Sequence, residues 1–263
     1  MNEPRNPYAP PTAGVADHVP EPTDGTLIPN GRRVPAGNGV RWLSDAFRLF
    51  FQRPWQWIGI LLVFCVVWIA VSLIPFANVV SSVLWPVFGG GLMFAADVQR
   101  RDGSLAVGRM FAGFGPRFAP LASVGVVMLI SYPIMYLSVR AFVGSNVAAG
   151  MVLGRTDFDP MSVMSINFLL AMLVYLLFAL PIVAATYLAP ALIMLHDMKP
   201  GEAMKMSFAA VFKNVLPGFV FGVVLLIVLC VSAIPFGLGL LITLPVSIIT
   251  VYTMYRDVFV ESV

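Results

Sequence analysis

The sequence has little charge and few of the residues that catalysis and metal binding use. Only 11% of its 263 residues are charged, whereas a soluble domain has roughly 25%. Its two cysteines, Cys65 and Cys230, lie inside apolar runs, and no CxxC or His/Cys cluster occurs. Neither a disulfide nor a metal site is therefore expected.

Sequence motifs of phosphate chemistry and of nucleophilic catalysis are also missing. The chain contains no GxxxxGK[ST], GxGxxG or GxSxG, which are the patterns of phosphate loops, dinucleotide loops and nucleophile elbows. His196 and Asp197 are adjacent, but no nucleophile or metal ligand accompanies them. We expect no enzyme activity and no cofactor. Asp197 is instead expected to cap a helix beginning near Lys199, or to pair with Lys199 or Lys205.

Apolar residues, by contrast, make up 59% of the chain. A helix needs about 20 apolar residues to cross the hydrocarbon core of a bilayer. Pro181 and Pro190 interrupt the longest uncharged run, which we interpret as one kinked or tilted helix. The sequence therefore predicts an all-α integral membrane protein with six transmembrane helices. The runs are 57–74, 77–96, 118–138, 165–195, 216–234 and 237–255.

The distribution of basic residues predicts the orientation. With six spans, 14 of the 16 Lys and Arg residues fall on one side, and only Arg140 and Arg155 fall on the other. Basic residues concentrate on the cytoplasmic side, so both termini are expected in the cytoplasm of a bacterial inner membrane. The basic residues, which give the chain a net charge of +3, lie in loops beside apolar runs. This pattern favours anionic lipid headgroups as partners over nucleic acid.

Residues 1–40 contain eight prolines and five glycines, a composition typical of disorder. We expect a disordered cytoplasmic tail here, followed by a transmembrane domain over 41–263. The stretch from Asn6 to Pro11 is a candidate docking motif for a protein partner, and a solvated tether is the alternative. No cleavable signal peptide is expected, because the first apolar span begins only near Trp57.

The chain also carries signs of an internal repeat. Ile74-Pro75-Phe76 recurs as Ile234-Pro235-Phe236, and amphipathic stretches at 42–53 and 202–213 precede the first and fifth spans. We predict three parallel two-helix units, each introduced by a cytoplasmic interfacial helix. Each unit ends at an aspartate, and these three residues are candidates for cytoplasmic ion pairs that join the units. They are Asp97, Asp197 and Asp257.

Two further groups of residues are singled out by type and position. Basic and aromatic side chains beside the spans are expected to contact lipid headgroups; they are Arg48, Arg53, Trp55, Trp57, Lys205 and Lys213. Prolines and glycines within the spans are expected to kink helices or to allow close packing. They are Pro86, Gly89, Gly90, Gly91, Pro181, Pro190, Gly218 and Gly222. The alternatives are a ligand-exposing helix break at the three consecutive glycines, a homodimer contact at the GxxxG motif and a hinge at the two prolines of the fourth run.

The chain contains several short motifs, which include Val34-Pro35-Ala36-Gly37, Pro86 to Gly91, Ala189-Pro190-Ala191 and Leu195-His196-Asp197. In these motifs it resembles a family of uncharacterised proteobacterial six-helix inner-membrane proteins. That family is similar in layout to the membrane domain that precedes glycerophosphodiester phosphodiesterases. The resemblance implies a location and a fold, but no activity.

Two functions remain open from the sequence. The first is a non-enzymatic membrane protein that organises the envelope or interacts with lipid through its amphipathic stretches. The second is a small permease or lipid-handling transporter with a cavity between the helix repeats. Asp, Glu, Lys, Arg and His are missing from all six runs, which counts against proton-coupled transport. A tightly packed, closed bundle with no cavity near Gly89–Gly91 and Pro181 would count against the second function.

Overall fold

The computed structural model describes residues 25–74, 76–153, 159–234 and 236–260, and it is all-helical over these ranges, with 82% helix and no strand. The predicted fold class is confirmed at this level. Tail residues 1–24, Pro75, Pro235 and Arg155 lie outside the described residues. The elements in chain order are α1 (Asn38–Gln52), α2 (Pro54–Ser72), α3 (Ala77–Asp102), η1 (Val107–Phe114), α4 (Phe118–Met128), α5 (Ser131–Phe142), α6 (Ser145–Leu153), η2 (Pro160–Met164), α7 (Ile166–Tyr187), α8 (Ala189–His196), α9 (Pro200–Lys213), α10 (Val215–Ala233) and α11 (Leu240–Phe259).

Five helical stretches in the described chain are long and apolar enough to cross a membrane. They are Pro54–Ser72, Ala77–Asp102, Phe118–Phe142, Ile166–His196 and Val215–Ala233. α11 is not among them, because it ends in Arg256 and Asp257 and carries several hydroxyl side chains. Much of α11 is buried against α1, α2, α3 and α10, so its polar groups meet protein partners.

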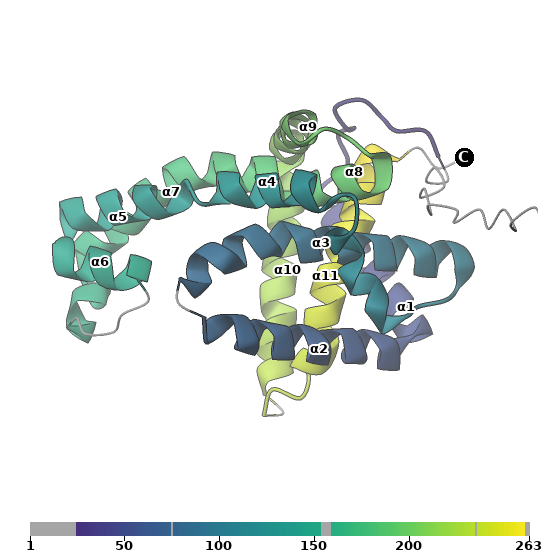
Figure 1. Ribbon diagram of the computed structural model, residues 1–263, viewed down its shortest axis with the longest axis horizontal. Helices are drawn as coiled ribbons and strands as arrows, with labels where there is room; N and C mark the ends of the chain where they lie inside the picture. Colours follow the sequence, from purple (N-terminus) through teal and green to yellow (C-terminus); the bar gives the residue numbers. More distant parts are fainter. Residues whose placement is uncertain (1–24, 75, 154–158, 235, 261–263) are drawn as a thin grey trace, which may run out of the picture.

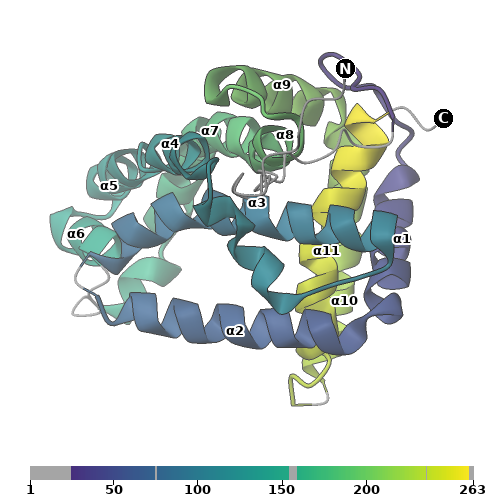
Figure 2. The ribbon, with the colours of Figure 1, turned by 45° about the vertical axis from the view of Figure 1, so that its right-hand side comes forward.

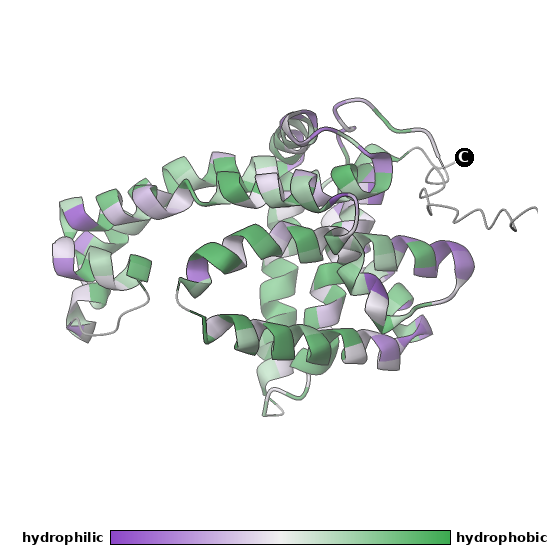
Figure 3. Ribbon diagram, in the orientation of Figure 1, coloured by the Kyte–Doolittle hydropathy of each residue, from purple (hydrophilic) through white to green (hydrophobic). Residues whose placement is uncertain are grey.

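The long helices run in two main directions. In Figures 1 and 2, α2 and α3 form an antiparallel pair, with α4, α5 and α7 running along the same direction above them. α10 and α11 form a second pair that crosses this direction in both views. Figure 3 shows hydrophobic residues along the helix bodies and hydrophilic residues mainly near the helix ends and in the connecting segments.

The tips of the two helix pairs have the same backbone feature. Phe76 and Phe236, at matching positions of the recurring Ile-Pro-Phe motif, have positive φ angles of 62° and 53°. Non-glycine residues adopt this left-handed conformation rarely, so its occurrence at both tips is a specific likeness. Both side chains are exposed.

A break separates α7 from α8 at Leu188, and a side chain from another helix fills it. The Leu188 amide donates to Ser207 Oγ (3.0 Å), and Ser207 Oγ donates to the Ala184 carbonyl (2.7 Å). A hydroxyl of α9 is thus inserted where the helix would bond directly from residue 188 to residue 184. The bend lies here, next to Pro190, whereas Pro181 stays inside α7.

α3 runs unbroken through Gly89, Gly90 and Gly91. A Cβ atom at Gly91 would lie 2.0 Å from the Met110 carbonyl oxygen of η1, and one at Gly90 would meet the Leu121 side chain at 2.8 Å. The glycines therefore permit close packing, and the alternative of a broken, ligand-exposing helix is wrong. η1 itself is a 3-10 helix, where a third amphipathic α-helix was expected.

The first described residues lie against the last ones. Leu27 and Val260 form an isolated antiparallel bridge, and the Ile28 amide donates to the Phe259 carbonyl (2.8 Å). Residues 25–37, which we call the N-terminal strap, continue across α9 and α10: Asn214 accepts from the Val34 amide (2.9 Å) and donates to the Arg32 carbonyl (3.0 Å). The part of the predicted tail nearest to α1 is thus held by specific hydrogen bonds.

Candidate functional site

Asp257 lies at the centre of a hydrogen-bonded cluster near the end of α11. Its carboxylate accepts from Asn38 Nδ2 (2.6 Å) and Trp42 Nε1 (2.7 Å) and forms ion pairs with Arg32 and Arg41, each at 3.2 Å. Only 6% of the Asp257 side chain is exposed. A buried carboxylate requires partners of this kind. One residue therefore joins the N-terminal strap and α1 to α11.

Asp97 is fully buried and joins α3 to α11. The Tyr252 hydroxyl donates to one carboxylate oxygen at 2.8 Å, and Arg101, one helical turn later, pairs with the other oxygen. Arg100 Nε donates in turn to the Tyr252 hydroxyl at 3.0 Å. The tyrosine thus links the acidic group to a second arginine.

Asp197 differs from the other two aspartates. Its side chain is 80% exposed, and it pairs with Arg117 Nε at 3.1 Å. It ends α8 with a left-handed backbone (φ 53°), and α9 begins after Lys199 without a side-chain cap. The expectation that Asp197 caps this helix or pairs with a lysine is wrong. Arg117 is 16% exposed, so water screens this pair mainly from the Asp197 side.

The residues predicted to contact headgroups have different environments. Trp57 is fully buried, and its Nε1 donates to Gln99 Oε1 (2.7 Å). The prediction that Trp57 contacts lipid headgroups is therefore wrong. Trp55, by contrast, is 79% exposed. Arg53 Nε donates to the Gly103 carbonyl (2.9 Å), and Lys213 Nζ to the Asn30 carbonyl (3.0 Å). Two further predicted residues remain on the surface: Arg48, beside Asp45, and Lys205.

The amphipathic helices bury more of their apolar faces in protein than the sequence suggests. In α1, Trp42, Ala46 and Phe50 are buried, and the helix packs on α10 and α11. Its main apolar face is thus covered by protein, and the interpretation of α1 as a helix lying with this face on lipid is wrong. α9 buries small side chains against α7 and α8 but leaves Phe208 and Phe212 exposed.

Gly218 and Gly222 of α10 do not mediate close packing within this chain. A Cβ atom at either position would meet nothing within 4 Å among the described residues. Both glycines instead line an apolar groove of about 560 Å³ between α7, α9 and α10. The groove shares Val183 and Tyr187 with the cavity described next.

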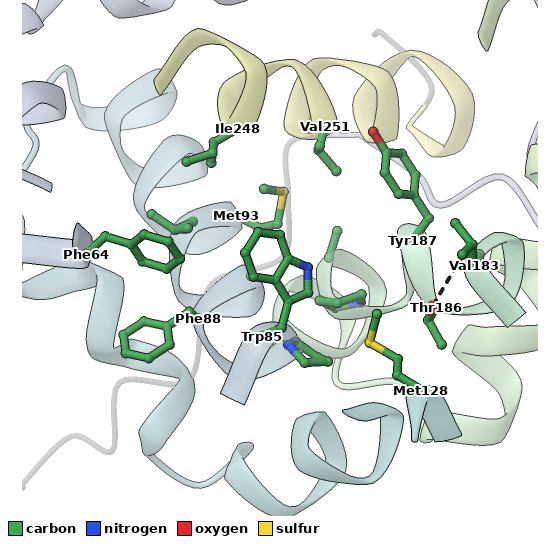
Figure 4. A pocket seen from close by; sticks show the side chains of 15 residues that line it. Phe64, Trp85, Phe88, Met93, Met128, Val183, Thr186, Tyr187, Ile248 and Val251 are labelled. Atoms are coloured by element: carbon green, nitrogen blue, oxygen red, sulfur yellow. Dashed lines mark hydrogen bonds between the residues drawn. The ribbon is translucent and has the colours of Figure 1, made fainter. Parts of the chain in front are cut away.

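An apolar cavity of about 250 Å³ lies where α3 and α11 face α7 and α8 (Figure 4). Trp85 and Met93 of α3, Val183 and Tyr187 of α7, and Val251 of α11 contribute to its walls. Gly89 lines it as well; a Cβ atom there would meet only Pro190, at an ordinary 3.7 Å. None of the lining residues is charged. The size and lining suit an apolar ligand or chain.

Within the described ranges, no group of three or more His, Cys, Asp or Glu residues is placed to hold a metal ion. The polar clusters around Asp257 and Asp97 connect helices, whereas the cavity and the adjoining groove offer apolar space for a ligand. Comparisons with protein-family models, with curated proteins and with solved structures found no match to this chain.

Proposed function

We propose that this chain is a non-enzymatic, multi-pass inner-membrane protein that binds and handles membrane lipid, with an acyl chain held in the cavity between α3, α7, α8 and α11. The observation that supports this proposal is the uncharged cavity itself, whose walls come from helices of all three proposed units. In a bilayer, the chains most abundant around such a space are lipid acyl chains. The cavity supports a lipid-handling role. Envelope organisation through amphipathic helices is less favoured, because other helices already cover the apolar face of α1.

The proposed topology is six spans with both termini in the cytoplasm. The bridge between Leu27 and Val260 supports it, because a chain that starts and ends on one side must cross an even number of times. Five helical stretches are long and apolar enough, and α11 supplies the sixth crossing. The excess of Lys and Arg on this side supports a cytoplasmic location.

The three-unit arrangement is proposed on two likenesses. The tips at Phe76 and Phe236 share a left-handed backbone, and Asp97 and Asp257 each accept a hydrogen bond from an aromatic side chain of another helix. Exposed aromatic residues near the charged end of each unit suit a membrane interface. They are Phe51 and Trp55, Phe111, Phe114 and Phe118, and Phe208 and Phe212.

Filling the cavity tests the proposal. Gly89→Leu places a larger side chain in the cavity without a backbone clash. The protein would be reconstituted in nanodiscs of phosphatidylethanolamine and phosphatidylglycerol and then moved to a mild detergent. Retained phospholipid would be counted by native mass spectrometry. We expect the unaltered protein to retain a lipid and Gly89→Leu to lose it.

The matched control is Gly201→Leu, the same change at an exposed position of α9 where a Cβ atom meets nothing within 4 Å. This variant should retain lipid as the unaltered protein does. Equal retention by all three proteins would contradict the proposal, and so would the absence of retained lipid from the unaltered protein.

A further inference from the structure

Two hydrogen-bond donors line the cavity without a partner. The indole nitrogen of Trp85 and the hydroxyl of Tyr187 make no hydrogen bond to any residue that the structure describes. In Figure 4 the nitrogen of Trp85 is on the side of the ring nearer α7, and Tyr187 lies at the end of α7. Thr186, also in the lining, is different, because its hydroxyl donates to the Ile182 carbonyl at 2.9 Å.

Unpaired donors in an apolar site indicate the chemistry of a ligand. Trp85 and Tyr187 are 53% and 37% exposed, and within a bilayer this exposed surface would face lipid tails instead of water. A polar group that lacks both water and a protein partner is unfavourable, and an acceptor atom on the bound molecule would remove this penalty. No cationic side chain lines the cavity, so a phosphate or carboxylate would find no counter-charge there. The acceptor that fits two neutral donors is an uncharged carbonyl oxygen.

We propose that the cavity binds an ester-linked glycerolipid whose ester carbonyl oxygens accept hydrogen bonds from Trp85 Nε1 and the Tyr187 hydroxyl. This inference rests on the proposed function and adds the class of ligand. A diacylglycerolipid carries two ester carbonyls, which matches two donors on two helices, α3 and α7. Its charged headgroup would remain outside the uncharged lining. Trp and Tyr side chains are common at the membrane interface, the level at which ester groups lie.

The test compares two lipids that differ only in the carbonyls. Diacyl and dialkyl phosphatidylglycerol of equal chain length would compete for the purified full-length protein in detergent, with native mass spectrometry as the readout. We expect the unaltered protein to prefer the diacyl lipid about tenfold, the equivalent of about 1.4 kcal/mol. Tyr187→Phe removes only a hydroxyl and should reduce this preference to about threefold or less. The double variant with Trp85→Phe should show none.

Thr186→Val is the control, because it also removes a hydroxyl from the lining, but one that is already hydrogen-bonded. It should keep the tenfold preference. Equal binding of both lipids by the unaltered protein would overturn the inference, and so would an unchanged preference in the double variant. If Gly89→Leu still abolished lipid retention in that case, the proposed function would stand without the carbonyl contacts. Lipid retention by Gly89→Leu would refute the proposed function itself.

Discussion

Asp257→Asn tests how the N-terminal strap is held. The substitution keeps the size of the side chain but removes the negative charge, and it replaces one acceptor oxygen with an amide that donates. In the structure both carboxylate oxygens are in use: one faces the guanidinium groups of Arg32 and Arg41, and the other accepts from Asn38 and Trp42. In either orientation of the new side-chain amide, its NH2 group therefore faces N–H donors in place of an acceptor.

The magnitude follows from the burial of each partner. Arg32 and Arg41 are 40% and 61% exposed, so water replaces part of what they lose, and each pair contributes at most about 1 kcal/mol. Trp42 is 1% exposed, and leaving its indole N–H unsatisfied costs about 1–3 kcal/mol. Arg32 belongs to the strap, and Arg41 and Trp42 belong to α1, so together these terms predict a loss of about 2–4 kcal/mol in the attachment of the strap and the start of α1 to α11.

Limited proteolysis with trypsin measures this attachment. Arg33 is exposed, but the next residue, Val34, is buried and its amide is bonded to Asn214, so cleavage after Arg33 requires the strap and the adjoining start of α1 to detach together. When opening and closing are fast compared with cleavage, the rate follows the population of the open form. A loss of 2 kcal/mol then raises the cleavage rate about 30-fold.

Asp197→Asn is the matched control, because it makes the same chemical change at an aspartate whose side chain is 80% exposed. Its effect on cleavage after Arg33 should be less than about threefold, because its partner Arg117 lies in neither the strap nor α1. If Asp257→Asn behaved like this control, with the same cleavage rate and unfolding temperature, Asp257 would not hold the strap.

Two further changes test the packing of the helices. Ser207→Ala leaves the Leu188 amide and the Ala184 carbonyl without the hydroxyl that bridges them; we expect a loss of about 1–3 kcal/mol, seen as a lower unfolding temperature and faster amide exchange at Leu188, and unchanged exchange would contradict this role. Gly91→Ala places a Cβ atom 2.0 Å from the Met110 carbonyl oxygen; separating α3 from η1 should cost about 1–3 kcal/mol in thermal unfolding, whereas Gly108→Ala, with nothing within 4 Å of its Cβ atom, should cost far less.

Several features of the structure could not be read from residue types alone. Gln99, Ser207 and Asn214 are buried polar residues that connect helices, and none of them stood out in the sequence. Their one signal is a hydrogen-bonding side chain close to an otherwise apolar run. That signal is weak, because a hydroxyl or amide on a helix often bonds to its own backbone, and only the position of the neighbouring helix decides otherwise.

The apolar composition by itself determined that the chain is helical, because a backbone surrounded by hydrocarbon must satisfy its hydrogen bonds within each segment. The same rule places the long helices near the predicted runs. Which apolar face meets protein was decided by the tertiary structure. Trp55 and Trp57 are two residues apart, yet the first is exposed and the second is buried against Gln99. A helical period fixes which residues share a face, but the partner of that face lies elsewhere in the chain.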